Sequence, residues 1–224
     1  MTIPDITPGE IDADTLQRSI ARRDPVILDI GCNDGSHTLW FLKIFRRARV
    51  YSFEPDPRPR KRFMENVKHH RAVLLEFALA AEDGETEFHM SSGQHPDPRY
   101  DRVFVKDWDY SGSIRKPKLH VQAYPWVKFE RTITVPTRRL DTWAKAENLG
   151  QVDLIWADVQ GAEVDLIAGG SETLRRTRYF YTEYSNEELY EGEITLEGIL
   201  ERLPEFEIVH RYQNDVLLRN AGLV

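Results

Sequence analysis

The feature that most constrains the fold is an apolar run entering a glycine turn, followed by a second predicted strand that ends on an acid. The first run covers residues 26–30 and continues as Gly31-Cys-Asn-Asp-Gly35, and the second covers residues 49–53 and ends on Glu54. Continuous apolar runs of this length are typical of strands buried on both faces of a parallel sheet. The order of strand, glycine turn, helix, strand and acid is that of a nucleoside-binding βαβ unit, in which the acid accepts the ribose hydroxyls.

The turn residues distinguish between two classes of nucleoside cofactor. A dinucleotide-binding turn reads Gly-x-Gly-x-x-Gly, because the backbone must approach a pyrophosphate closely. This chain has Asn33 and Ser36 at the second and third of those glycine positions. Gly-x-Asn-x-Gly followed by Glu54 instead suits S-adenosylmethionine, which has no pyrophosphate. We therefore expect S-adenosylmethionine as the cofactor and methyl transfer as the reaction.

The composition predicts a globular chain with a sizeable core. The 224 residues are 41% hydrophobic and 30% charged, and no apolar run reaches the roughly 18–20 residues of a membrane helix. The start of the chain lacks the pattern of a secretory signal, and a single cysteine, Cys32, excludes an internal disulfide. We therefore expect a cytoplasmic protein.

The charge of the chain limits the class of partner. A formal net charge of −7 argues against broad binding of polyanions, which requires a basic surface. A local basic patch remains compatible with this charge. We expect a small hydroxylated acceptor, a saccharide or natural product, and neither nucleic acid nor a membrane span. The oligomeric state stays open.

The pattern along the chain predicts an N-terminal arm, residues 1–24, and a single domain, residues 25–224. Strands are predicted over 26–30, 49–53, 73–80, 86–90, 132–136, 152–158 and 179–183, with a terminal hairpin of 207–211 and 215–219. Helices are predicted over 14–22, 39–45, 57–69, 140–147 and 196–203, and a further one from about 160 to 174. This order predicts a Rossmann-like α/β fold, with a seven-stranded, mostly parallel sheet, one antiparallel edge strand and helices on both faces.

Residues 91–131 differ from the rest of the domain. They are rich in glycine, proline and serine and have no sustained period, which favours a lid or binding loop. Basic and aromatic residues alternate here: Arg99, Tyr100, Arg102, Lys106, Trp108, Tyr110, Arg115, Lys116, Lys118, Tyr124 and Trp126. Such a mixture can stack nucleic acid bases, bind sugars or simply cover a core. Because Asp97, Asp101, Asp107 and Asp109 dilute the basic character, we favour a substrate lid.

Acids follow several predicted strands at the point where each strand ends. Glu54, Asp158 and Glu183 occupy such positions, and ligands of open parallel sheets bind outside the carboxyl ends of the strands. Each acid alone could be a helix N-cap. Because all three follow the ends of predicted strands, we favour a ligand-binding or catalytic site. Asp158 is our first candidate for the polar group nearest the reacting centre, with Glu183 and His37 as further catalytic candidates.

The remaining candidates surround the cofactor. We expect Gly31, Asn33 and Gly35 at its methionine end, Glu54 at the ribose, and Phe77 or Ala78 beside the adenine. Asp29 is placed to reach the turn amides or the ammonium group. Cys32 is interpreted as a small packed residue, and Glu163 as a residue that stabilises its turn. The histidines show no metal-type spacing, so no metal site is predicted, although Asp158 and Glu183 could share a hard cation.

Taken in order, these motifs resemble the FkbM family of methyltransferases, from about Val26 to Arg219. The motifs are Asp29-Ile-Gly-x-Asn-x-Gly-x-x-Thr38, Glu54-Pro55, Ala78-Leu79, Glu82-Asp-Gly84, Ser111-Gly-Ser113, Arg139-Leu-Asp-Thr142, Asp158-Val-Gln-Gly-Ala-Glu163 and Glu183. The resemblance implies an O-methyltransferase acting on hydroxyls of sugars, glycolipids or natural products, with Thr38 and Asp158 also at the cofactor. The chain departs from the family at Trp156, where a lysine is frequent.

Three alternatives stay open from the sequence. The basic and aromatic residues of the lid are compatible with methylation of RNA or protein. A non-catalytic protein that binds S-adenosylmethionine would carry the same cofactor motifs. A nicotinamide-dependent oxidoreductase is the third, and the replaced glycines at positions 33 and 36 argue against it.

Overall fold

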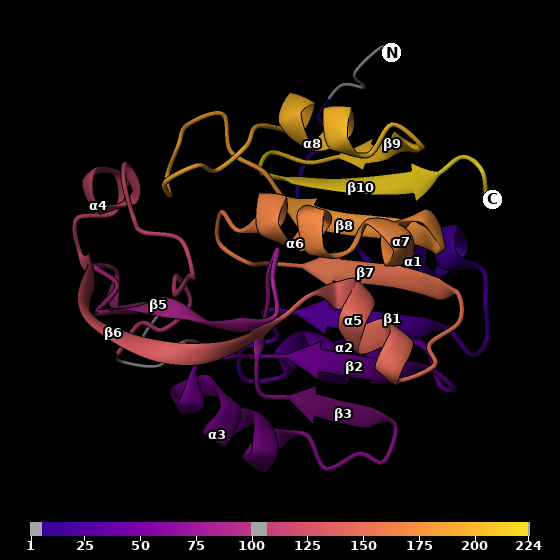
Figure 1. Ribbon diagram of the computed structural model, residues 1–224, viewed down its shortest axis with the longest axis horizontal. Coiled ribbons are helices and arrows are strands. Elements are labelled where there is room, and N and C mark those ends of the chain that lie inside the picture. Colours follow the sequence, from indigo (N-terminus) through magenta and orange to yellow (C-terminus); the bar gives the residue numbers. More distant parts are fainter. Residues whose placement is uncertain (1–5, 100–106, 224) are drawn as a thin grey trace.

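The computed structural model describes residues 6–99 and 107–223, and its main sheet has seven strands (Figure 1). Their order is β3-β2-β1-β7-β8-β10-β9, with bounds β1 Val26–Ile30, β2 Arg49–Phe53, β3 Ala72–Leu75, β7 Val152–Ala157, β8 Thr177–Glu183, β9 Phe206–Arg211 and β10 Asp215–Asn220. All neighbours are parallel except β10, which runs antiparallel to both β8 and β9. The predicted α/β fold is confirmed, with the reversed strand in the terminal hairpin at the edge of the sheet.

Two hydrophobic clusters cover the two faces of this sheet. The helices are α1 Ala13–Ile20, α2 Ser36–Ile44, α3 Pro57–Asn66, α4 His120–Ala123, α5 Leu140–Ala146, α6 Glu163–Gly169, α7 Ser171–Arg175 and α8 Leu196–Arg202. Ile27 of β1 packs in the cluster that includes side chains of α1, α2 and α3. Leu28 and Ile30 pack in the opposite cluster, with side chains of α5, α6, α7 and α8. Burial on both faces explains why β1 is apolar at every position but Asp29.

Local capping accounts for several helix starts. The side chains of Asp12 and Asp56 accept backbone N–H groups at the starts of α1 and α3, and Pro57 supplies the fixed φ of the first turn of α3. The single helix predicted for residues 160–174 is instead two, α6 and α7, which meet at Gly170. At Gly169 a Cβ atom would lie 2.0 Å from the Ala80 carbonyl oxygen, so the backbone approaches its neighbour closely there.

The prediction of one strand over residues 73–80 is wrong. β3 ends at Leu75, and Ala78–Leu79 form a separate strand, β4, in a three-stranded sheet of order β4-β6-β5. Here β5 (Gly84–Gly93) and β6 (Val127–Arg138) pair antiparallel and are longer than the predicted strands at 86–90 and 132–136. Figure 1 shows this sheet extending beyond the carboxyl ends of β1 and β7. The segment between β5 and β6 contains α4, while Tyr100, Asp101, Arg102 and Lys106 lie outside the described residues.

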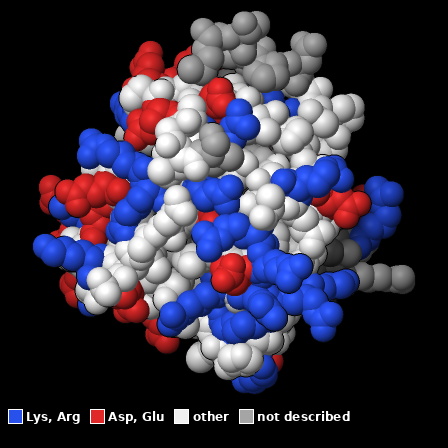
Figure 2. All heavy atoms as spheres, turned by 90° about the vertical axis from the view of Figure 1, so that its right-hand side faces the viewer, with Lys and Arg blue, Asp and Glu red and all other residues white. Residues whose placement is uncertain are grey.

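Basic residues gather on one end of the molecule. Figure 2 shows them on the face at the right of Figure 1, which is the end where the parallel strands begin. Arg22, Arg23, Arg46 and Arg47 line a groove there, between the ends of α1 and α2. Cations near helix carboxyl ends interact favourably with the helix dipole. The chain therefore has a local basic patch despite its negative net charge, and this patch lies at the end opposite the carboxyl ends of the parallel strands.

Among residues 6–99 and 107–223, no helix is long and apolar enough to cross a membrane.

Candidate functional site

The turn after β1 is held tightly against its neighbours. Gly31, Asn33 and Gly35 all adopt positive φ values, of 80°, 44° and 84°, which favour glycine and asparagine. The N–H groups of Gly31 and Cys32 donate to the Phe53 carbonyl oxygen at 2.9 and 3.0 Å, and so tie the turn to the end of β2. The pattern Gly-x-Asn-x-Gly is therefore the pattern that this backbone conformation needs.

Glu54 lies directly beside this turn and is buried, with 6% of its surface exposed. Its Oε2 atom accepts the Asn33 N–H at 3.0 Å and its Oε1 atom accepts the Asp56 N–H at 2.8 Å. Burial, with a further contribution from the charge of Asp56, raises the pKa of Glu54 to about 8. When Glu54 is ionised, each carboxylate oxygen keeps a further lone pair for a hydroxyl donor.

A cavity of about 630 Å³, including the part open to solvent, lies over the turn and Glu54. Of the predicted cofactor residues, the structure brings together in its wall Gly31, Asn33, Glu54, Phe77, Ala78 and Asp158. Phe77 packs edge-on against Phe53 at a ring-centroid distance of 5.6 Å, which fixes one apolar side of the cavity. The volume is in the range of small-molecule sites.

Three further predicted cofactor residues do not line the cavity: Asp29, Gly35 and Thr38. Thr38 Oγ1 donates to Asp29 Oδ2 at 2.5 Å and lies 2.8 Å from Ser52 Oγ. Asp29 Oδ1 is buried and has no hydrogen-bond partner among the described residues. Burial, opposed by the Thr38 hydrogen bond, raises the pKa of Asp29 to about 7.

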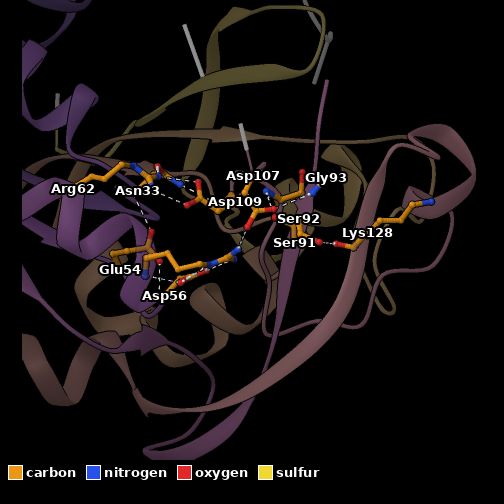
Figure 3. A network of polar contacts seen from close by, with 12 residues as sticks. Asn33, Glu54, Asp56, Arg62, Ser91, Ser92, Gly93, Asp107, Asp109 and Lys128 are labelled. Atoms are coloured by element: carbon orange, nitrogen blue, oxygen red, sulfur yellow. Dashed lines mark hydrogen bonds and ion pairs between the residues drawn. The ribbon is translucent and has the colours of Figure 1, made fainter. Parts of the chain in front are cut away.

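A network of polar contacts joins the insertion to the cofactor turn (Figure 3). Arg62 of α3 donates to both carboxylate oxygens of Asp109 at 2.8 Å and to Asn33 Oδ1 at 3.1 Å. Asn33 Nδ2 in turn donates to the Asp109 carbonyl oxygen at 3.3 Å. Sequence reasoning missed the role of Arg62 and counted Asp109 only as a charge, because no local signal pairs residues this far apart in the chain.

At the ends of β7 and β8, one amide joins two predicted catalytic acids. Gln160 Nε2 donates to Asp158 Oδ1 at 2.6 Å and to Glu183 Oε2 at 3.2 Å. Gln160 has a positive φ of 52°, and its side-chain oxygen accepts the Tyr190 hydroxyl at 3.1 Å. In the sequence, Gln160 stands at a variable position of the motif that runs from Asp158 to Glu163. No sequence pattern marked Tyr190 as a residue of the site.

The two acids influence each other electrostatically. Burial raises the pKa of Asp158 to about 6, against the opposing effect of the Gln160 hydrogen bond. The charge of Asp158 is the main cause that raises the pKa of Glu183 well above its usual value, followed by partial desolvation at the end of β8. Carboxylates whose pKa values approach neutrality are suited to general base catalysis.

His37, on the first turn of α2, lines a groove together with Asp158 and Glu183, so the structure brings the three predicted catalytic residues to one groove. The imidazole lies 4.9 Å from the Trp156 ring, between centroids. His37 is exposed, and partial desolvation by neighbouring side chains lowers the pKa of its imidazole, so the neutral form is favoured. Asp215, at the start of β10, lines the same groove and was not predicted.

Within the described part of the chain, no three His, Cys, Asp or Glu residues are grouped so that they could hold a metal ion. Cys32 is buried beside the turn, and burial raises the pKa of its thiol well above the usual value. The thiol is therefore protonated at neutral pH and is not a nucleophile.

Comparison with known proteins identifies relatives of this chain. The family model described as the FkbM methyltransferase domain matches residues 29–216. The chain is 49% identical over 209 residues to the 2-O-methyltransferase NoeI of Sinorhizobium fredii, covering 91% of this chain and 83% of that protein. It is 26% identical over 151 residues to Methyltransferase 1 of Beauveria bassiana, covering 65% of this chain and 58% of that protein.

Among solved structures, precorrin-6y C5,15-methyltransferase from Geobacter metallireducens matches with a TM-score of 0.44 and 12% identity, covering 92% of this chain and 84% of that chain. A SAM-dependent methyltransferase from Anabaena variabilis matches with a TM-score of 0.39 and 10% identity, covering 98% of this chain and 100% of that chain.

Proposed function

The chain belongs to the FkbM methyltransferase family, and on that premise we propose that it transfers a methyl group from S-adenosylmethionine to a hydroxyl of a sugar-containing acceptor. One observation carries the proposal. Asp158, an acid with a pKa of about 6, lies in the wall of the cavity that we assign to the cofactor and also lines the grooves beyond it. The name of the relative, a 2-O-methyltransferase, supports oxygen as the methylated atom.

The residues of the cavity fit S-adenosylmethionine. Gly31, which lines the cavity, packs directly against the Asp158 backbone, and the free lone pairs of ionised Glu54 suit the ribose hydroxyls. Phe77 and Ala78 offer an apolar wall for the adenine. Asp29 stands behind the turn, where its unpartnered carboxylate oxygen contributes negative charge near the methionine end.

When bound, S-adenosylmethionine supplies an electrophilic methyl group, whereas an alcohol is a poor nucleophile at neutral pH. The protein must therefore position the hydroxyl and accept its proton. Gln160 holds Asp158 by Oδ1, which leaves Oδ2 to receive the proton as the new bond forms. Positioning supplies about 7–11 kcal/mol of barrier reduction in favourable cases, and a general base supplies about 10²–10⁴-fold.

We propose further that residues 25–224 form the catalytic domain after an N-terminal arm, and that the insertion at residues 91–131 acts as a lid. Two contacts support the lid: the Arg62–Asp109 ion pair with the cofactor side, and the Tyr190 hydroxyl donating to the Ser111 carbonyl oxygen at 2.8 Å. The cytoplasmic location expected from composition stays a prediction.

The test is methyl transfer from S-adenosylmethionine with an isotopically labelled methyl group to a panel of neutral saccharides, with the position of the label read by NMR. Label on a sugar oxygen is the expected result. Label found only on RNA or protein supplied in parallel would select the rival acceptor class, and cofactor binding without transfer to any of them would indicate a non-catalytic binding protein.

A further inference from the structure

A second cleft opens beside the cofactor cavity and shares Tyr110, Asp158 and Gln160 with it. Its volume is about 1560 Å³, including the part open to solvent. One side comes from the insertion and α4, and the other from the ends of β7 and β8. We propose that this cleft is the acceptor subsite and that it takes an uncharged or cationic saccharide, never an anionic one. This inference rests on the proposed function, because it assumes methyl transfer across Asp158.

Aromatic rings form the side of the cleft that faces away from the strands. Trp108 and Trp126 pack edge to face at a centroid distance of 4.8 Å and an interplanar angle of 84°. Tyr110 lies 4.9 Å from Trp108, and Tyr124 is 43% exposed. Rings held by one another lose little entropy on binding and offer apolar faces with polar tips. Such faces suit the C–H groups on one side of a sugar ring.

Acids line the opposite side of the cleft. They are Asp158, Glu163, Glu183, Glu187 and Glu193, and no lysine or arginine is among the described residues that line it. Glu163 has a pKa of about 8 and is protonated at neutral pH, whereas Asp158 has a pKa of about 6 and is ionised there. The Asp158 carboxylate accepts hydrogen bonds from hydroxyl or ammonium donors and repels phosphate, sulfate and uronate groups. The cleft therefore combines stacking surfaces with acceptors for hydroxyl groups, and its charge selects against anions.

The distribution of charge over the molecule agrees with this selection. Arg22, Arg23, Arg46 and Arg47 line the groove at the far end of the sheet (Figure 2), so a polyanion would be drawn to that end and not to the acids around Asp158. The aromatic and basic residues of the insertion are compatible with RNA methylation. The acids that line the cleft around Asp158 disfavour RNA as the acceptor.

The test uses a printed glycan array that carries neutral, amino-sugar, and sulfated or uronate-bearing saccharides, probed with the full chain saturated with S-adenosylhomocysteine. Binding is expected on neutral and amino sugars and not on the anionic set. Trp126→Ala is expected to weaken the strongest neutral interaction about fivefold or more, as truncation of an anchoring aromatic does, while the affinity for S-adenosylhomocysteine stays unchanged. Thermal melts of each variant show whether the fold is retained.

A surface substitution tests whether the negative charge of the cleft excludes anionic saccharides, and it leaves the aromatic side of the cleft unchanged. Glu187 is exposed at the rim of the cleft, and Glu187→Arg should increase binding to the anionic saccharides. Glu201→Arg, which makes the same charge change at an exposed position of α8, should not.

Three outcomes would overturn the inference: binding confined to anionic glycans, neutral binding that Trp126→Ala does not weaken, and anionic binding that Glu187→Arg does not increase. Binding to no glycan at all would also overturn it. If S-adenosylhomocysteine still binds and a sugar-containing acceptor that is absent from the array is methylated in that case, the proposed function survives. Loss of both would remove the two proposals together.

Discussion

Gly31 and Asp158 are in direct backbone contact, although β1 and β7 bring them from distant parts of the chain. A Cβ atom at position 31 would lie 1.8 Å from the Asp158 carbonyl oxygen. The Asp158 N–H donates to the Ile30 carbonyl oxygen at 2.9 Å, directly beside this contact. The turn assigned to the methyl donor and the acid assigned to the proton are therefore fixed relative to each other by two neighbouring strands.

Gly31→Ala should abolish this contact. The methyl group would displace the Asp158 backbone, and alanine at a positive φ costs about 1 kcal/mol or more. We expect both the affinity for S-adenosylhomocysteine and the rate of methyl transfer to fall, as measured by calorimetry and by labelled methyl transfer. Gly150→Ala is the matched control, since no atom lies within 4 Å of its added Cβ. Equal effects at the two positions would contradict the contact.

Glu54→Gln should weaken cofactor binding several-fold or more, because one of the two carboxylate acceptors is replaced by a donor that faces the Asn33 or Asp56 N–H. Glu76→Gln, at an exposed position just after β3, should leave the affinity unchanged. Calorimetric titration with S-adenosylmethionine measures both. An unaltered dissociation constant for the Glu54 variant would remove this residue from the site.

Asp158→Asn should lower kcat by about 10²–10⁴-fold with little change in cofactor affinity, since the asparagine cannot accept the proton. In the wild-type protein the rate should rise with pH through about 6, where Asp158 loses its proton. The variant should lose this dependence. Asp14→Asn, at an exposed position of α1, controls for the loss of one charge. A wild-type pH profile in the Asp158 variant would exclude this acid as the base.

Arg62→Leu should destabilise the protein by about 3 kcal/mol, the order expected when a buried carboxylate loses its partner. Asp109 is only 5% exposed, and three Arg62 hydrogen bonds would be lost with the substitution. The double variant Arg62→Leu with Asp109→Leu should recover part of the loss. Urea denaturation measures the free energy of unfolding. Arg60→Leu, which breaks a pair with the exposed Glu76, should cost less than about 1 kcal/mol.

Buried acids should make the free energy of unfolding fall as pH rises. Burial raises the pKa of Glu163 from 4.5 to about 8, so between these values the native state holds a proton that the unfolded state has released. The unfolded state binds fewer protons, and stability therefore decreases with increasing pH across this window. Glu163→Gln, which does not titrate, should show a smaller decrease in urea denaturation series across this window. A slope equal to that of wild type would show that Glu163 does not hold this proton.

Much of the site was predictable because it depends on short-range patterns. The bounds of β1 and β2 agree with the strands predicted at residues 26–30 and 49–53, since a strand buried on both faces is mostly apolar. The turn from Gly31 to Gly35 was predictable for the same local reason, because its positive φ values restrict the residue types. The carboxyl ends of parallel strands share one edge, so Glu54, Asp158 and Glu183 could be placed together from strand order alone.

Other features depend on which segments meet in space, and no local pattern encodes that. The break after Leu75 arises because Ala78–Leu79 pair with β6, and the partner strand is far along the chain. Gln160 became a central residue only because β7 and β8 are neighbours, which places Asp158 and Glu183 within reach of one amide. The ion pair between Arg62 and Asp109 likewise exists only after the insertion folds over α3.

The sequence by itself thus determined the first two strands, the cofactor turn and the acids at the strand ends, because each follows from backbone restrictions or burial within a few residues. The tertiary structure decided which of those residues face the cavity and which, like Thr38, support it from behind. It also decided the pKa values of the acids, since burial and neighbouring charges are properties of the packed molecule and not of any single segment.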